Sequence, residues 1–274
     1  MTTSRTAVPM ATQNRVRWLG VASLLGCALV LSGCASMPAD PAARAAREAN
    51  HDPFEATNRK IFAFNEFVDR SLIKPVAKGY RRVLPGPVRD ALRHLLDNLY
   101  EPLIFGNDIL QGRLKAARTT GCRFLMNSTV GFAGLTDVAS EHKLPKQTGD
   151  FGQTLWTWGF PEGPYLVLPV FGPSNPRDGI GSGVDAYLDP VRLATRHLDW
   201  VDDAAIYRIT TDGIDIRSRN IDSLDEMQKE AVDYYASFRS LFRQHREAEL
   251  SASGPGAARP PPDFYQDSGD AAQK

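Results

Sequence analysis

The sequence places one thiol, Cys34, in a setting that favours covalent modification. The motif Leu31-Ser32-Gly33-Cys34 ends a short apolar stretch that follows basic residues. Small residues before a cysteine are typical of a lipobox, whose thiol carries a diacylglycerol, whereas an ordinary secretory signal ends in an Ala-x-Ala-like site. The stretch is too short for a membrane-spanning helix of about 20 residues. The motif therefore predicts a lipoprotein signal peptide over residues 1–33 and lipidation of Cys34.

Other patterns that could support catalysis are incomplete. Ser182 lies between glycines, but Ile180 stands where the G-x-S-x-G elbow of serine hydrolases requires glycine. The five histidines are scattered, and no glycine-rich phosphate loop is present. We therefore expect no enzyme, no metal site and no cofactor besides the lipid on Cys34. Because Cys27 leaves with the signal peptide, Cys122 has no intramolecular partner, and we expect its thiol to be buried.

Charge and composition narrow the class of protein. Removing residues 1–33 leaves 241 residues with 29 basic and 32 acidic side chains, so the predicted mature chain carries no basic surplus. A nucleic-acid-binding protein normally has such a surplus, and we expect no nucleic-acid partner. Residues 34–50 are rich in Ala, Pro and Arg and indicate a tether. Residues 246–274 end in proline-rich and polar sequence and indicate a disordered tail.

The region between these segments, residues 51–245, carries helical periodicity. Apolar residues recur at helical spacing along Val88–Leu99, Ile206–Leu224 and the segment 226–245. Several prolines are expected to separate short helices, namely Pro75, Pro85, Pro87 and Pro102. The best strand candidate, Tyr165–Val170, is bracketed by prolines that deny ladder hydrogen bonds, so a central strand is not expected there. The predicted fold class is all-α.

A proline-rich stretch over residues 145–176 leaves two interpretations open. It interleaves six prolines with Trp156, Trp158, Phe160, Tyr165 and Phe171. Trp and Tyr favour the membrane–water interface, so the stretch could meet a membrane. It could equally be a long aromatic loop packed on its own helices.

Three separated blocks carry a family resemblance. The first is Asp52-Pro53-Phe54-Glu55-x-x-Asn58-Arg59 with Phe64-Asn65. The second is Asn127-Ser128-Thr129-x-Gly131-x-x-Gly134-Leu135-x-Asp137-Val138-Ala139. The third is Phe151-Gly152-Gln153-Thr154-Leu155, followed by Gly163-Pro164-Tyr165-x-x-Leu168-Pro169-x-Phe171-Gly172-Pro173-Ser174-x-x-Arg177-Asp178. In this order and behind a lipobox, the blocks resemble the MlaA/VacJ phospholipid-transport lipoproteins, over roughly residues 50 to 190.

The resemblance implies a ring of amphipathic helices lying in the inner leaflet of the outer membrane of a Gram-negative bacterium, around a central polar channel. It implies removal of phospholipids misplaced in the outer leaflet, which keeps the membrane asymmetric. The implied partners are phospholipid, a trimeric outer-membrane porin and a periplasmic carrier of the MlaC type. Ala35 after the lipidated cysteine also favours the outer membrane, since Asp there would argue for inner-membrane retention. Helices in the interface need an apolar and a polar face, which the stripes supply.

The resemblance also suggests a gate and a hinge. Phe64 and Asn65 match a point near the start of the ring, and could form a gate or simply pack a helix. Gly131 and Gly134 lie in a segment that resembles the family's mobile hairpin, although a rigid turn would use glycines too.

Arg208, with Asp212 and Asp215, is the candidate lining of the lipid channel. A forked, permanently charged guanidinium suits phosphate contact, and the alternative for Arg208 is a solvated surface charge. Arg177 and Asp178 are interpreted as a structural pair that fixes the proline-rich loop. The competing function is a scaffolding lipoprotein that organises porins without moving lipid.

Overall fold

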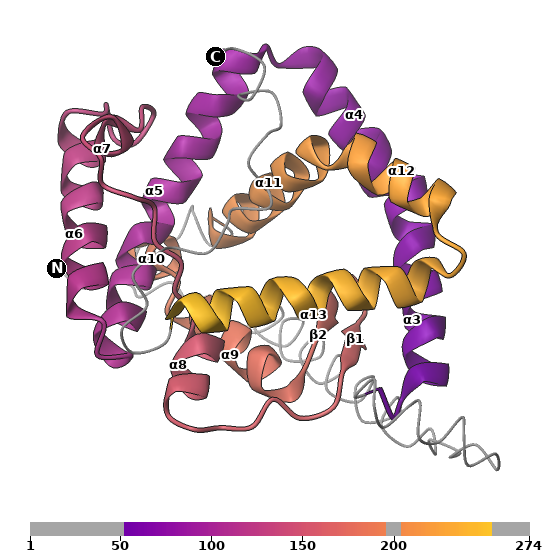
Figure 1. The fold of residues 1–274 in the computed structure, drawn as a ribbon. Coiled ribbons are helices and arrows are strands. Elements are labelled where there is room, and N and C mark those ends of the chain that lie inside the picture. The colour runs from indigo at the N-terminus through magenta and orange to yellow at the C-terminus, as the bar shows by residue number, and fades with distance from the viewer. Residues whose placement is uncertain (1–51, 196–203, 254–274) are drawn as a thin grey trace, which may run out of the picture. The chain divides into compact units, whose positions relative to one another are not determined.

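The structure is a computed structural model that describes residues 52–195 and 204–253 (Figure 1). Its contacts divide the chain into residues 1–57 and residues 58–274, and the contacts discussed below lie in the second part. The helices are α3 (Glu55–Val68), the π-helical turn η1 (Asp69–Ile73), α4 (Lys74–Val83), α5 (Gly86–Leu110), α6 (Leu114–Thr129), α7 (Val138–Glu141), α8 (Phe151–Thr157), α9 (Pro176–Tyr187), α10 (Pro190–Thr195), α11 (Ala204–Arg219), α12 (Ile221–Glu230) and α13 (Tyr234–Ser253).

The predicted all-α class is confirmed, with a small hairpin of β1 (Leu166–Leu168) and β2 (Gly172–Ser174) among the described residues. Within the second part, α5 packs along α6, α8 against α9, and α11 against both α4 and α5. Helix α13 contacts α8, and Figure 1 shows it as the long yellow helix. None of the described helices combines the length and apolar character that a membrane span requires.

Side-chain caps fix where three of these helices begin. The carboxylates of Asp137 and Asp150 accept hydrogen bonds from backbone N–H groups in the first turns of α7 and α8. Asn175 caps α9 in the same way, and Pro176 follows it at the first helical position. Such residues satisfy N–H groups that have no partner within the helix. The local sequence therefore sets the direction in which each helix leaves its loop.

The hairpin is held by two asparagines of α3 that lie two helical turns apart. Asn58 donates from Nδ2 to the Tyr165 carbonyl and accepts from Val167 N–H, both at 3.0 Å. Asn65 donates to the Leu168 carbonyl at 2.9 Å and accepts from Val170 N–H at 2.7 Å. The two side chains thus provide partners for backbone groups in and next to β1 and hold the hairpin against α3. The segment therefore forms no central strand, as expected from the prolines that bracket it.

An aromatic cluster packs the same hairpin against α3 and α13. Phe62 lies with its ring centroid 5.4 Å from that of Tyr235, nearly edge-on, and Tyr165 contacts Tyr235 and Phe242. Phe62, Tyr165 and Tyr235 are buried. Tilted and edge-on aromatic pairs add specific attraction to the burial of apolar area. At Tyr165 the aromatic loop is therefore packed on the protein's own helices.

A buried charge network joins α5 to the segment after α6. Arg123 donates from Nε to Glu101 at 3.0 Å, from Nη2 to Asp137 at 3.1 Å and from Nη1 to the Leu144 carbonyl at 2.6 Å. Burial raises the pKa of Glu101 to about 7 in spite of Arg123. For Asp137 burial also acts upward, but hydrogen bonds from Ser140 and the Arg123 charge outweigh it and lower the pKa to about 2.

Three sequence expectations are wrong. Pro102 does not separate helices, because it lies inside α5, where the adjacent Glu101 is anchored to α6 by Arg123. The helical region does not end at residue 245, because α13 continues to Ser253, whose hydroxyl donates to Gln153 at 3.0 Å. Cys122 is exposed rather than buried, since its neighbour Arg123 takes the inward position on α6.

Replacing Arg123 by leucine tests the buried network. Removal of one partner leaves the Glu101 carboxylate buried without its ion pair, and we expect the free energy of unfolding to fall by about 3–5 kcal/mol. Chemical unfolding followed by circular dichroism in mild detergent measures this loss. Arg118→Leu, at an exposed position of the same helix, is the matched control. Equal effects of the two substitutions would contradict the role assigned to Arg123.

Candidate functional site

A pocket of about 530 Å³ opens between α5, α9, α11, α13 and the hairpin. Its walls combine charged side chains with aromatic and aliphatic ones. The lining residues are Tyr100, Asp150, Phe171, Pro173, Ser174, Asp178, Ser182, Asp185, Ala186, Arg208, Ile209, Asp212, Phe242, His245, Arg246 and Glu249. Ser182 lies within α9 rather than at a strand-to-helix turn, so its surroundings differ from those of a hydrolase nucleophile.

Arg246 is the centre of the charged wall. Its guanidinium donates to Asp150 at 2.7 and 2.9 Å, to Asp178 at 2.9 and 3.0 Å and to Glu249 at 3.0 Å. Charge-assisted, forked contacts of this kind are among the stronger hydrogen bonds in proteins. Sequence reasoning missed Arg246 because it placed the residue in the tail. The signal was available, since Phe242, Arg246, Glu249 and Ser253 recur at helical spacing.

The predicted pairing of Arg177 with Asp178 is confirmed, at 3.0 Å between Nε and Oδ1. Asn175 also donates to Asp178, at 2.7 Å. Burial acts to raise the pKa of Asp178, but the hydrogen bonds and charge of Arg246, helped by Arg177, outweigh it and lower the pKa. Asp178 therefore fixes the start of α9 as an ionised group.

Arg208 and Asp212, two of the predicted channel residues, both line the pocket and lie one helical turn apart on α11. The Arg208 side chain is 8% exposed and forms an ion pair with Asp189, so it is not a solvated surface charge. The other carboxylate oxygen of Asp189 accepts from Val191 N–H at 2.9 Å and thereby caps α10. Nε of Arg208 is buried and has no hydrogen-bond partner among the described residues. One donor of this guanidinium thus lacks an acceptor within the described part of the chain.

Asp215, the third predicted channel residue, does not line this pocket. It is buried, accepts from the Tyr80 hydroxyl at 3.0 Å and pairs with Arg219 at 3.0 Å. These contacts tie α11 to α4. Its role in a channel stays a prediction, whereas its contacts here are structural.

Two carboxyl groups of the pocket are shifted by burial. Burial raises the pKa of Asp185 to about 6, although Phe151 N–H and Asn107 donate to its oxygens at 2.9 and 3.1 Å. Burial also raises the pKa of Asp212, and the nearby Asp97 adds to the effect. Burial therefore disfavours the charged form of these two carboxyl groups, and a ligand that brings positive charge would stabilise it.

The proposed gate residues have different surroundings. Phe64 is 49% exposed on α3, whereas Asn65 is occupied by the two hydrogen bonds that hold the hairpin. The hairpin in turn supplies Pro173 and Ser174 to the pocket wall. Asn65 is therefore connected to the pocket through the hairpin, and its action as a gate stays a prediction.

Gly131 and Gly134 lie in a closely packed turn after α6. Gly134 N–H donates to the Asn127 carbonyl at 2.8 Å, and Thr136 N–H to that of Gly131 at 3.0 Å. A Cβ at Gly131 would lie 2.4 Å from the Thr136 carbonyl oxygen. The turn exposes large apolar side chains, those of Val130, Phe132 and Leu135. This geometry favours a rigid turn that presents an apolar tip, and hinge motion stays a prediction.

Comparison with known proteins defines the class to which this fold and pocket belong. The family model described as MlaA lipoprotein matches residues 50–249. The chain belongs to the MlaA lipoprotein family.

Individual relatives cover most of the chain. The intermembrane phospholipid transport system lipoprotein MlaA of Haemophilus influenzae is 32% identical over 82% of this chain and 87% of its own length. Its Escherichia coli K12 counterpart is 32% identical over 80% and 83%. An uncharacterized Rickettsia prowazekii protein is 33% identical over 73% and 78%. A solved structure from work on the structural basis for maintenance of bacterial outer membrane lipid asymmetry matches with a TM-score of 0.63 at 28% identity, covering 74% of this chain and 99% of that one.

Alanine at position 134 tests the rigidity of the glycine turn. Gly134 has φ +95°, and its added Cβ would lie 2.5 Å from Cβ of Asn98. We expect Gly134→Ala to lower the melting temperature, because both the backbone conformation and the space oppose it. Gly79→Ala, in α4 with nothing nearby, is the control and should stabilise by up to about 1 kcal/mol. An unchanged melting temperature of Gly134→Ala would favour a loose hinge.

Asp185 predicts a dependence of stability on pH. Its pKa is raised on folding, from an ordinary value of 3.8 to about 6. Its contribution to stability is therefore complete below pH 3.8 and lost as the pH rises through 6, by on the order of 3 kcal/mol. Unfolding curves between pH 4 and 8 should fall more steeply for the unmodified chain than for Asp185→Asn, which cannot ionise. Asp90→Asn, at an exposed position, should keep the steeper fall. Parallel curves for all three proteins would refute the assignment.

Proposed function

We propose that this chain is an outer-membrane lipoprotein that removes phospholipids misplaced in the outer leaflet and passes them through a polar channel to a periplasmic carrier. The channel would be enclosed by a ring of the amphipathic helices, and the result would be an asymmetric outer membrane. Family membership supports this proposal, since two relatives that cover most of the chain are intermembrane phospholipid transport lipoproteins.

The observation that carries the proposal is an inverted distribution of polarity. Arg208 and Asp212 line a pocket inside the helical region, while large apolar side chains are exposed on the elements around it. Examples outside the pocket lining with more than half of their surface exposed are Phe67, Trp158, Phe160, Ile180 and Tyr187. In water such exposure is unfavourable, but a protein embedded in a lipid leaflet would cover these side chains with acyl chains.

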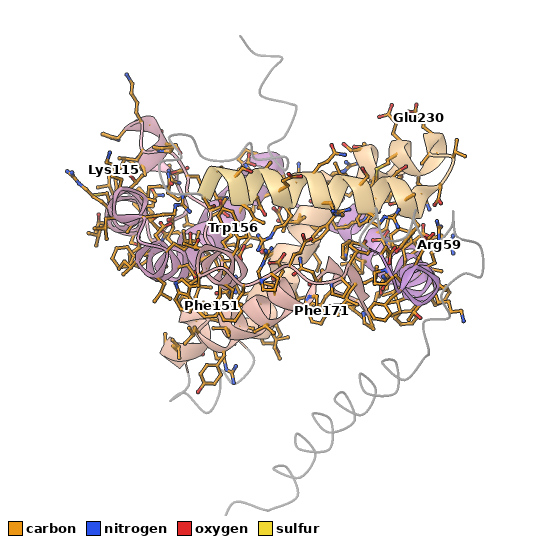
Figure 2. The ribbon with its side chains drawn as sticks, turned by 60° about the horizontal axis from the view of Figure 1, so that its bottom comes forward. Arg59, Lys115, Phe151, Trp156, Phe171 and Glu230 are labelled. Carbon is orange, nitrogen blue, oxygen red and sulfur yellow. The ribbon has the colours of Figure 1, made fainter. Side chains whose placement is uncertain are left out.

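The exposed aromatic residues also suggest how the helices would sit in the leaflet. In Figure 2 Phe151 and Phe171 lie toward the bottom of the view and Glu230 lies toward the top. Trp158, Phe160 and Phe171 are exposed members of the proline-rich stretch, and their rings suit a membrane interface. Tyr165 of the same stretch is buried, so at that residue the loop packs on its own helices, and contact of the exposed rings with a membrane stays a prediction.

The lipid on Cys34 would deliver and retain the protein, while the helices make the main membrane contact. Residues 1–50, with the predicted signal peptide, Cys34 and tether, lie outside the described residues. A trimeric porin beside the ring and an MlaC-type carrier on the periplasmic side complete the proposed route. No covalent step is required, because a headgroup would exchange hydration for polar contacts in the channel.

Gene deletion and complementation test the transport function. We expect deletion to increase outer-leaflet phospholipid and detergent sensitivity, and the unmodified gene to reverse both. Cys34→Ala should fail to complement, because the precursor stays uncleaved and mislocalised, which immunoblotting of membrane fractions would detect. Unchanged outer-leaflet phospholipid after deletion would contradict transport and favour a porin-organising scaffold. A Cys34→Ala protein that is processed normally and recovered in the outer membrane would contradict the lipidation site.

A further inference from the structure

We propose that the pocket prefers phospholipids whose headgroup carries a primary ammonium, as in phosphoethanolamine, with the phosphate at Arg208 and the ammonium at Asp212. This inference rests on the transport function proposed above and adds the headgroup class. It is carried by three features of the pocket: its charge, the Arg208 donor that lacks an acceptor among the described residues, and the poorly compensated charge of Asp212.

The charge of the wall disfavours a headgroup that brings only negative charge. The lining contains five carboxylates, those of Asp150, Asp178, Asp185, Asp212 and Glu249, against the two guanidinium groups of Arg208 and Arg246. Arg246 is engaged by three of these carboxylates. Its charge is therefore already compensated, and it offers no surplus to an incoming anion. A zwitterionic headgroup adds no net charge to this environment.

Arg208 provides the contact for phosphate. Its side chain is 8% exposed, and Asp189 occupies Nη2, but Nε is buried without a partner among the described residues. A buried donor without an acceptor is costly, so an acceptor that reaches it is favoured. A rotation of the guanidinium at the pocket wall would bring this donor to a phosphate oxygen that enters the pocket. The guanidinium carbon also lies 5.4 Å from the centre of the Tyr100 ring, which holds the group at the wall.

Asp212 provides the contact for ammonium. It lines the pocket one turn after Arg208, and the two positive charges that act on it, those of Arg208 and Arg219, are already engaged by Asp189 and Asp215. Asp185, in contrast, uses both oxygens to accept from Asn107 and from Phe151 N–H. Burial raises the pKa of the Asp212 carboxyl, which shows that its charge is poorly solvated there. An ammonium would supply both hydrogen bonds and a compensating charge.

The spacing of the two side chains matches the headgroup. Residues four apart on a helix have Cβ atoms roughly 5–6 Å apart on one face. In phosphoethanolamine two carbon atoms separate the phosphate oxygen from the ammonium nitrogen, so both groups can reach neighbouring side chains at once. A phosphoglycerol headgroup presents hydroxyl groups instead of a cation, so it could donate hydrogen bonds to Asp212 but would bring no positive charge to it.

Lipid selection by the full-length lipidated protein tests the inference. The protein is incorporated into vesicles of phosphatidylethanolamine and phosphatidylglycerol at equal amounts with identical acyl chains, and lipids that remain bound after mild detergent extraction are counted by mass spectrometry. We expect phosphatidylethanolamine to be enriched about fivefold, equivalent to about 1 kcal/mol. Asp212→Asn should bring the ratio close to one, and Asp212→Glu should keep the enrichment.

Controls separate the outcomes. Glu230→Gln makes the same charge change at an exposed position outside the pocket and should retain the full enrichment. Arg208→Gln should reduce retention of both lipids. Bound lipid that mirrors the vesicle composition, or enrichment that persists in Asp212→Asn, would overturn the headgroup preference and leave transport standing. Retention of neither lipid by the unmodified protein would overturn both proposals.

Discussion

Arg246 makes the interaction on which the geometry of the pocket depends. It joins α13 to Asp150, the cap of α8, and to Asp178 in the first turn of α9. Without this guanidinium the two carboxylates would face each other where α8 and α9 cross. The crossing is close because both helices carry glycine there, and a Cβ on Gly181 would lie 2.3 Å from the backbone nitrogen of Gly152. Charge and small residues thus set the arrangement together.

Buried polar and charged side chains also hold the helices together away from the pocket. Among the described residues, more polar than apolar side chains are buried, including the ion pair of Arg123 with Glu101 and the carboxylates of Asp189 and Asp215. Buried polar groups stabilise a fold only when their partners are in place, so such a structure is specific but intolerant of single losses. The apolar side chains left outside are available to a lipid environment, which connects the cohesion of the helices with the function proposed for them.

Helix α11 contributes both to the cohesion of the fold and to the wall of the pocket. Asp215 and Arg217 anchor it to α4 and η1 through Tyr80 and Asp69. One to two turns earlier, Arg208 and Asp212 face the pocket. The helix is therefore anchored at one end by ion pairs and hydrogen bonds, and at the other end it places Arg208, whose buried Nε has no acceptor among the described residues, at the pocket wall. A polar group at a pocket wall that lacks a hydrogen-bond partner can bind a transient ligand, whereas a group whose hydrogen bonds are all made within the protein cannot.

Local sequence determined much of this protein. The apolar stripes and the glycines of the turn at residues 131–134 are short-range features, so the helical class could be predicted, whereas the caps at Asp150 and Asn175 were recognised only in the structure. The three family blocks and the match of Arg208 with a polar helix face indicated the class of function. Arg177 with Asp178 could also be predicted, because sequence neighbours need no tertiary information to meet.

Tertiary structure alone decided which charges are paired. Arg246, assigned by sequence to a tail, compensates carboxylates 68 and 96 positions away, and Asn65 proved to hold a hairpin rather than only pack a helix. Cys122 and Asp215 were placed wrongly or incompletely because rotation about a helix axis, which determines burial, depends on the neighbours that pack against it. Periodicity identifies a polar face, but the partner across the gap determines whether a charge on that face is neutralised or left available for a ligand.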